Sequence, residues 1–262
     1  MTHANGTVRP SLEEIEAAAA ASPPRPDAPR PAPRPEPTPE AIDWKAAVDR
    51  IAERSRPHRE EQRKARERRE RILAEQRREI RQARNRELSA AQVPPRYRDA
   101  TADHPAVADW VTRTLRGGVL AAQGLVLNGP VGCGKTWQAY GAWRTVAQQT
   151  GCRAVAVDVP AFLDSLRPGR TPRVPLEEVE RAELLLLDDL SAERVSEWTE
   201  EVVYRLINAR WNACLPTIIT LNAPGTTLRD RLGGRVASRL NGLGRIVSWP
   251  ADAPDRRVRP QG

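Results

Sequence analysis

Residues that bind zinc or form disulfides are scarce in this sequence. Its 262 residues include only three cysteines and three histidines. The cysteines, at positions 133, 152 and 214, are too few and too scattered for a disulfide framework or a zinc site of the Cys-x-x-Cys kind. Such a chain suits a reducing compartment, and we therefore expect a cytoplasmic location.

Long apolar runs are missing as well. No stretch approaches the roughly 18 consecutive apolar residues that predict a transmembrane helix. The alanine run at 17–21 follows Glu13, Glu14 and Glu16, whereas a signal peptide begins with basic residues and has a leucine-rich centre. We therefore expect neither a signal peptide nor a membrane partner.

Proline and positive charge are in excess, each in its own segment. Nine prolines between Pro23 and Pro39 alternate with charged residues, which predicts a disordered tail over residues 1–39. Between Arg50 and Leu88, 15 Lys and Arg stand against eight Glu, a net of +7 out of the chain's formal +8. Strong positive charge often indicates nucleic acid binding, but here it belongs to one segment and says nothing about the rest.

The basic segment predicts a helical arm over residues 40–92. A first helix begins near Glu40 and ends before Pro57, with an apolar stripe at i, i+4 and i+7 formed by Trp44, Val48 and Ile51. A second helix covers residues 58–90, where oppositely charged pairs four residues apart favour a helix but apolar side chains are few. A solvated spacer and an arm that docks a partner or nucleic acid both fit this pattern.

From about Val93 the chain reads as one α/β domain that extends to residue 262. Strands are predicted at 125–128, 154–159, 184–188, 217–221 and 245–249, and helices at 104–115, 135–149, 161–166 and 197–211. Short β-rich runs separated by helices indicate a five-stranded parallel sheet covered on both faces. We expect a three-layer αβα fold.

The most informative motif directly follows the first predicted strand. It fits the phosphate-binding loop (P-loop) template G-x-x-x-x-G-K-[ST] and consists of Gly129, Pro130, Val131, Gly132, Cys133, Gly134, Lys135 and Thr136. The glycines let backbone N–H groups point at a β-phosphate, Lys135 reaches the β and γ oxygens, and the Thr136 hydroxyl takes one position on Mg²⁺. The motif predicts a P-loop NTPase that binds ATP and Mg²⁺.

Two acids and an amide follow two later strands. The leucine run at 184–187 ends in Asp188 and Asp189, the pattern of a Walker B element. We assign Asp188 to the metal and Asp189 to the attacking water. Asn222 follows the strand at 217–221 and is expected to act as a sensor beside the γ-phosphate, although Asn-Ala-Pro is also ordinary turn chemistry.

Two arginines share one face of a predicted helix near the end of the chain. Arg235 and Arg239 stand four residues apart. An arginine given to the γ-phosphate of a neighbouring subunit stabilises charge in the transition state, which would make activity depend on a homo-oligomer. Surface solubility is the alternative, because the whole chain is rich in arginine.

Together these residues resemble the AAA+ ATPases of the DnaC type, which are bacterial and phage helicase loaders, and the similar IstB-type transposition helpers. The resemblance covers residues 93–257 and rests on the motifs at 94–97, 129–136, 184–190, 203–210, 217–222 and 238–240. It implies that Arg239 is an arginine finger acting in trans and that Arg256 or Arg257 senses the nucleotide. The chain departs from the family at Leu221, where serine is usual, and in its proline-rich, basic amino-terminal part.

The resemblance implies an ATP-dependent helicase loader that contacts single-stranded DNA and a replicative DNA helicase. An IstB-type transposition helper is an alternative that the sequence hardly separates from the first. A slowly hydrolysing, nucleotide-gated adaptor is another, because Asp189 stands where many AAA+ enzymes carry the longer glutamate.

Overall fold

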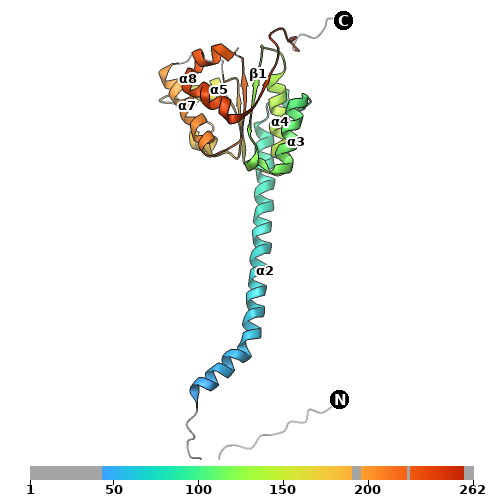
Figure 1. The fold of residues 1–262 in the computed structure, drawn as a ribbon, viewed down its shortest axis with the longest axis vertical. Coiled ribbons are helices and arrows are strands. Elements are labelled where there is room, and N and C mark those ends of the chain that lie inside the picture. Colours follow the sequence, from blue (N-terminus) through green and yellow to red (C-terminus); the bar gives the residue numbers. More distant parts are fainter. Residues whose placement is uncertain (1–42, 191–195, 223–224, 257–262) are drawn as a thin grey trace, which may run out of the picture. The chain divides into compact units, whose positions relative to one another are not determined.

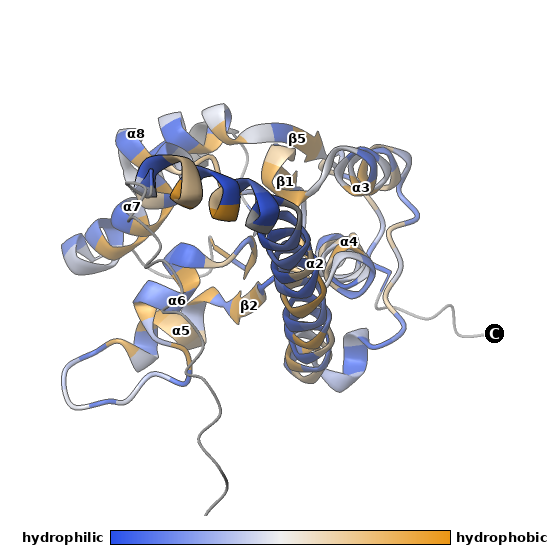
Figure 2. Ribbon diagram, turned by 90° about the horizontal axis from the view of Figure 1, so that it is seen from below, coloured by the Kyte–Doolittle hydropathy of each residue, from blue (hydrophilic) through white to orange (hydrophobic). Residues whose placement is uncertain are grey.

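The computed structural model describes residues 43–190, 196–222 and 225–256. The proline-rich tail predicted over residues 1–39 lies outside these ranges. Helix α2 (Trp44–Gln92) is continuous, whereas the sequence predicted two helices separated at Pro57. That prediction was wrong, because the helix continues through Pro57 despite the lost hydrogen bond and the clash of the proline ring, and the many Arg, Glu and Gln residues beyond it favour a helix. In Figure 2 most of α2 is coloured as hydrophilic.

Five strands form one parallel sheet, as predicted. They are β1 (Gly124–Asn128), β2 (Ala154–Asp158), β3 (Leu184–Asp188), β4 (Thr217–Leu221) and β5 (Gly244–Ser248), in the order β2-β3-β4-β1-β5. All four strand pairings are parallel. In this order β1 lies between β4 and β5, so the segments that follow β1, β3 and β4 meet at one edge of the sheet.

Helices cover both faces of the sheet (Figure 1). One face packs against α3 (Pro105–Gly117) and α4 (Lys135–Thr150), which follow the short 3-10 turn η1 (Pro95–Tyr97) along the chain. The other face packs against α5 (Val159–Ser165), α6 (Leu176–Arg181), α7 (Glu197–Asn212) and α8 (Gly225–Leu243). Alternate residues of β3 point to opposite sides, so Leu184 and Leu186 join the first core while Leu185 and Leu187 join the second.

The last turns of α2 pack onto the sheet domain. Ser89 is buried, and the Arg86 Nε donates to the carbonyl of Gln148 at the end of α4 over 2.8 Å. The Gln92 amide donates to Ala154 O and accepts from Ala156 N, at 3.2 and 2.9 Å. Because β2 is an edge strand, this one side chain covers part of its open edge. The last turns of α2 therefore contact both α4 and the edge of the sheet.

Arg210 fixes α7 to the end of the sheet opposite the strand carboxyl ends. Its side chain is fully buried and burial lowers its pKa to about 9. The guanidinium donates to the Thr217 hydroxyl and to carbonyl oxygens of Val179, Glu180, Ala182 and Pro216. The arginine of the 203–210 motif is thus a structural residue that joins α6, α7 and the start of β4.

Candidate functional site

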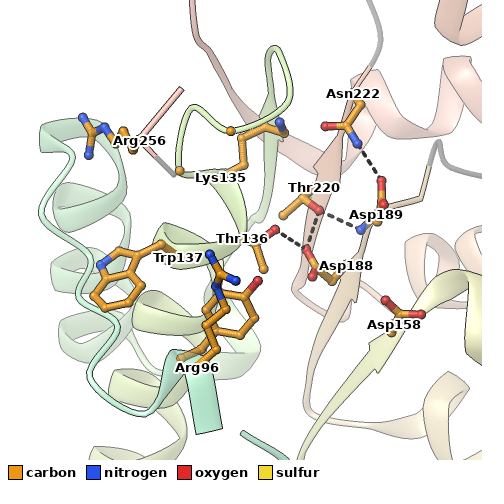
Figure 3. Close-up of a pocket in the computed structure, with 13 residues that line it drawn as sticks. Arg96, Lys135, Thr136, Trp137, Asp158, Asp188, Asp189, Thr220, Asn222 and Arg256 are labelled. Atoms are coloured by element: carbon orange, nitrogen blue, oxygen red, sulfur yellow. Dashed lines mark hydrogen bonds between the residues drawn. The ribbon is translucent and has the colours of Figure 1, made fainter. Parts of the chain in front are cut away.

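A cavity of about 500 Å³ opens at the carboxyl ends of β1, β3 and β4. It is lined by Arg96, Tyr97, Gly132, Gly134, Lys135, Thr136, Trp137, Asp158, Asp188, Asp189, Thr220, Asn222 and Arg256. Figure 3 shows the acids and the amide on the right of the cavity and Lys135 with its loop to their left. Most of the predicted side chains therefore meet in one place, as parallel strands require.

The loop between β1 and α4 has the backbone of an anion-binding turn. Gly132 and Gly134 have φ of 84° and 101°, a conformation that favours glycine. Helix α4 begins at Lys135, so its free N–H groups face the cavity. The Lys135 Nζ donates to the carbonyls of Gly129 and Pro130 at 2.9 and 2.7 Å, and its side chain is buried. The lysine is thus held at the loop that the motif predicts it to serve.

Asp188 is the buried acid of the site. Thr136 and Thr220 both donate to its Oδ1, over 3.0 and 2.7 Å. Burial raises the pKa of Asp188 above its ordinary value, and Asp189 and Asp158 add to the rise, while the two threonine hydrogen bonds oppose it. A carboxylate next to a hydroxyl presents two hard oxygen donors, the ligands that Mg²⁺ prefers.

The described residues contain no group of three or more His, Cys, Asp and Glu side chains that could hold a metal by themselves. Mg²⁺ does not require such a cage, because it usually binds one or two protein oxygens together with phosphates and water. Thr136 and Asp188 fit that role, and a bound Mg²⁺ would supply positive charge to bridge phosphate oxygens.

Asp189 turns away from the strand axis toward Asn222. Its φ is 61°, unusual for a residue other than glycine, and its N–H donates to the Thr220 hydroxyl over 2.8 Å. The Asn222 amide donates to Oδ1 of Asp189 over 2.7 Å (Figure 3). The acid and the amide that the sequence analysis assigned to hydrolysis and sensing are therefore in direct contact.

The segment after β5 returns to the P-loop. Arg256 N donates to the Gly132 carbonyl over 3.0 Å, and the Arg256 side chain lies against Gly134. Of the two arginines proposed to sense nucleotide, Arg256 lines the cavity and Arg257 lies outside the described residues.

The two arginines of α8 do not line this cavity. The Arg239 guanidinium lies 4.1 Å from the centroid of the Trp211 ring, and the Arg235 guanidinium lies 5.2 Å from that of Tyr204. Both aromatic residues belong to α7. Neither Arg235 nor Arg239 lines the phosphate site of its own subunit, and an action in trans stays a prediction.

Five lining residues were not assigned from the sequence as site residues, namely Arg96, Tyr97, Trp137, Asp158 and Thr220. Thr220 offered one signal, a polar side chain within an apolar strand two residues before Asn222. Its contacts depend on β4 pairing with β3, which a motif does not show. Asp158 ends β2 opposite Asp188 and caps α5 by accepting from Ala161 N.

No helix among the described residues is both long enough and apolar enough to cross a membrane. No model of a known protein family matches the chain, and no curated protein matches it.

Several solved structures are similar to the chain. DnaI is 21% identical with a TM-score of 0.55, over 64% of this chain and 99% of its own. The DnaC helicase loader is 26% identical with a TM-score of 0.49, over 59% and 99%. AMPPCP-bound DnaA from Aquifex aeolicus is 23% identical with a TM-score of 0.48, over 59% and 50%.

At this level of identity the likeness to DnaI establishes the fold alone. The parallel sheet with helices on both faces is the architecture that the sequence predicted. The resemblance drawn from the motifs is thereby confirmed at the level of architecture. The domain has a three-layer αβα fold with a P-loop after its first strand, as the sequence predicted.

Proposed function

We propose that this protein binds ATP with Mg²⁺, hydrolyses it slowly and acts as a helicase loader in DNA replication. The observation that carries the nucleotide is the contact between Thr136, the last residue of the P-loop, and Asp188 at the end of β3. It joins a loop that cradles phosphate to an acid that can hold a metal. Lys135 and Asn222, on either side, neutralise and orient the terminal phosphate.

The contact between Asp189 and Asn222 supports slow hydrolysis of ATP. Asp189 reaches less far than a glutamate would, and the Asn222 amide already occupies its Oδ1. Activating water requires that carboxylate to accept a proton or to orient the water directly. The same observation favours the second candidate function, a nucleotide-gated adaptor that binds ATP and a partner but scarcely turns over.

The proposed partner is a replicative helicase, gripped by the start of α2. Trp44, Val48 and Ile51 lie on one stripe of that helix and are 71%, 59% and 65% exposed. Exposed large side chains at i, i+4 and i+7 suit insertion of a helix into an apolar groove. We propose a helicase as the protein that carries this groove because the chain's motifs resemble those of DnaC-type loaders.

Co-purification with the host or phage replicative helicase in the presence of ATP tests the proposal. The wild-type chain should retain helicase, and the Trp44→Ala, Ile51→Ala double variant should lose most of it. Ile80→Ala is the matched control, because Ile80 is 70% exposed on the same helix but lies outside the stripe. Retention that is equal in all three proteins would contradict the role of the stripe.

Activity separates the loader from the adaptor. The loader requires ATP hydrolysis stimulated by single-stranded DNA, and binding to that DNA should weaken with salt because phosphate contacts carry it. Lys135→Ala should abolish loading by a hydrolysing loader. A Lys135→Ala protein that still loads helicase would favour the adaptor.

A further inference from the structure

One arginine in the cavity has no assigned role. Arg96 belongs to η1, and its side chain points from that turn toward Thr136 (Figure 3). Within the described parts of the chain, no hydrogen bond or ion pair of its side chain is found. Arg98, two residues later, does not line the cavity.

One face of α4 holds the segment that carries Arg96. The Tyr97 ring stacks on Tyr140 with centroids 4.8 Å apart and an interplanar angle of 8°. Arg144 donates to the carbonyls of Arg98 and Ala100. Gly141 lets the backbone of residue 101 approach so closely that an added Cβ would lie 2.3 Å from it. The anchors follow Thr136 by four to eight positions on the same helix, so Arg96 is fixed relative to the P-loop.

The lysine and the acids of the cavity already have partners. Lys135 is held by loop carbonyls, Asp188 by two threonines, Asp189 by Asn222, and Asp158 caps α5. A guanidinium that has no partner among the described residues, aimed into a cavity that contains a phosphate-binding loop, is a ready donor for a phosphate oxygen.

We propose that Arg96 binds the phosphate chain of the nucleotide from within the same subunit, on the Thr136 side of the P-loop. The inference rests on the proposed nucleotide binding and adds a cation that neither the P-loop motif nor the predicted arginine finger contains. The planar guanidinium of Arg96 can donate two parallel hydrogen bonds to one phosphate, whereas Lys135 acts as a point charge.

Pyrophosphate is the probe, because it contains phosphate oxygens but no base or ribose. The experiment measures how well pyrophosphate and ATP displace a fluorescent ATP analogue from the full chain with Mg²⁺. Arg96→Ala should weaken both competitors about tenfold, the effect of losing one charge-assisted hydrogen bond. Arg96→Lys should recover part of that loss, because it keeps the charge but not the fork.

Arg98→Ala is the matched control and should leave both affinities within about twofold, since surface changes of this kind have small effects. Arg96 is exposed, so its variants should have the unfolding temperature of the wild type. Thermal unfolding is therefore measured as well, to check that each variant is folded. Wild-type pyrophosphate affinity in Arg96→Ala, or an equal loss in Arg98→Ala, would overturn the inference while ATP binding stands. A wild-type chain that binds no nucleotide would instead contradict the proposed function itself.

Discussion

The hydroxyl of Thr220 connects the two acids that follow β3. It donates to Oδ1 of Asp188 over 2.7 Å and accepts the N–H of Asp189 over 2.8 Å. Both neighbours lie at the end of one strand, and the hydroxyl comes from the strand beside it. A single buried side chain on β4 thus orients Asp188, the proposed metal ligand, and the unusual backbone of Asp189, which is proposed to act on the attacking water.

Thr220→Val should lower ATP hydrolysis at least about tenfold with a smaller effect on ATP affinity, because the P-loop is untouched while both acids lose their shared partner. The partly buried N–H of Asp189 would lose this hydrogen bond, at a cost of about 1 kcal/mol in the free energy of unfolding. Steady-state hydrolysis and urea unfolding measure the two effects. Thr220→Ser keeps the hydroxyl and should restore hydrolysis; a Ser variant as inactive as Val would contradict this role.

Asp188→Asn should stabilise the protein without nucleotide and remove its response to Mg²⁺ and ATP. Burial raises the pKa of Asp188, so the folded protein holds this proton more tightly than the unfolded chain does. The protonated Asp188 carboxyl therefore stabilises the folded protein at pH values below its ordinary pKa. This stabilisation is lost as the pH rises through the raised pKa. At neutral pH the ionised wild type therefore bears a destabilising cost that the uncharged amide avoids.

Urea unfolding across the acidic range checks the sign of that prediction. The stability gain of Asp188→Asn should shrink as the pH falls toward the ordinary aspartate pKa of about 4, where the wild-type carboxyl is protonated as well. Thermal unfolding with Mg²⁺ and ATP should show a rise for the wild type and little for the variant. A gain that is constant with pH would mean that the charge of Asp188 is not its cause.

Gly141→Ala should destabilise the domain by about 1–3 kcal/mol, because the new methyl group would overlap the backbone at Thr101. The segment that carries Arg96 would move with it, so nucleotide affinity should fall too. Gly117→Ala is the control, since nothing lies within 4 Å of a Cβ at that position, near the end of α3. Urea unfolding that ranks the two variants equally would contradict the close packing of residue 101 on α4.

The strands and the main acids could be predicted because their signals are local. The apolar runs of β3 and β4 end at the predicted residues, and the P-loop carries its own template. Side chains whose role depends on strand register or on contacts between distant segments were missed. Thr220 needs β4 beside β3, and Arg96 needs η1 to pack on α4. Arg256 was one of two candidate nucleotide sensors, and the contact that distinguishes it, the return of the chain to Gly132, has no local sequence signal. Pro57 is the opposite case: a proline is a strong local signal for a helix end, but helix α2 continues through it.

Trp211 offers a test of the proposed arginine finger. Its ring lies beneath the Arg239 guanidinium at 4.1 Å, a cation–π contact that restricts how the arginine is presented. If Arg239 serves a neighbouring subunit, Trp211→Ala should lower hydrolysis severalfold while ATP affinity stays near wild type, because the neighbour's P-loop is intact. Trp211→Phe keeps an aromatic face and should retain more activity.

Mixing two inactive proteins separates action in trans from a local effect. Arg239→Ala supplies an intact P-loop, and Lys135→Ala supplies an intact arginine. If the arginine crosses between subunits, a mixture should regain hydrolysis that neither protein shows alone, since some interfaces combine a functional loop with a functional finger. Arg235→Ala is the control on the same helix. A mixture that remains inactive at every ratio would restrict Arg239 to stacking on Trp211.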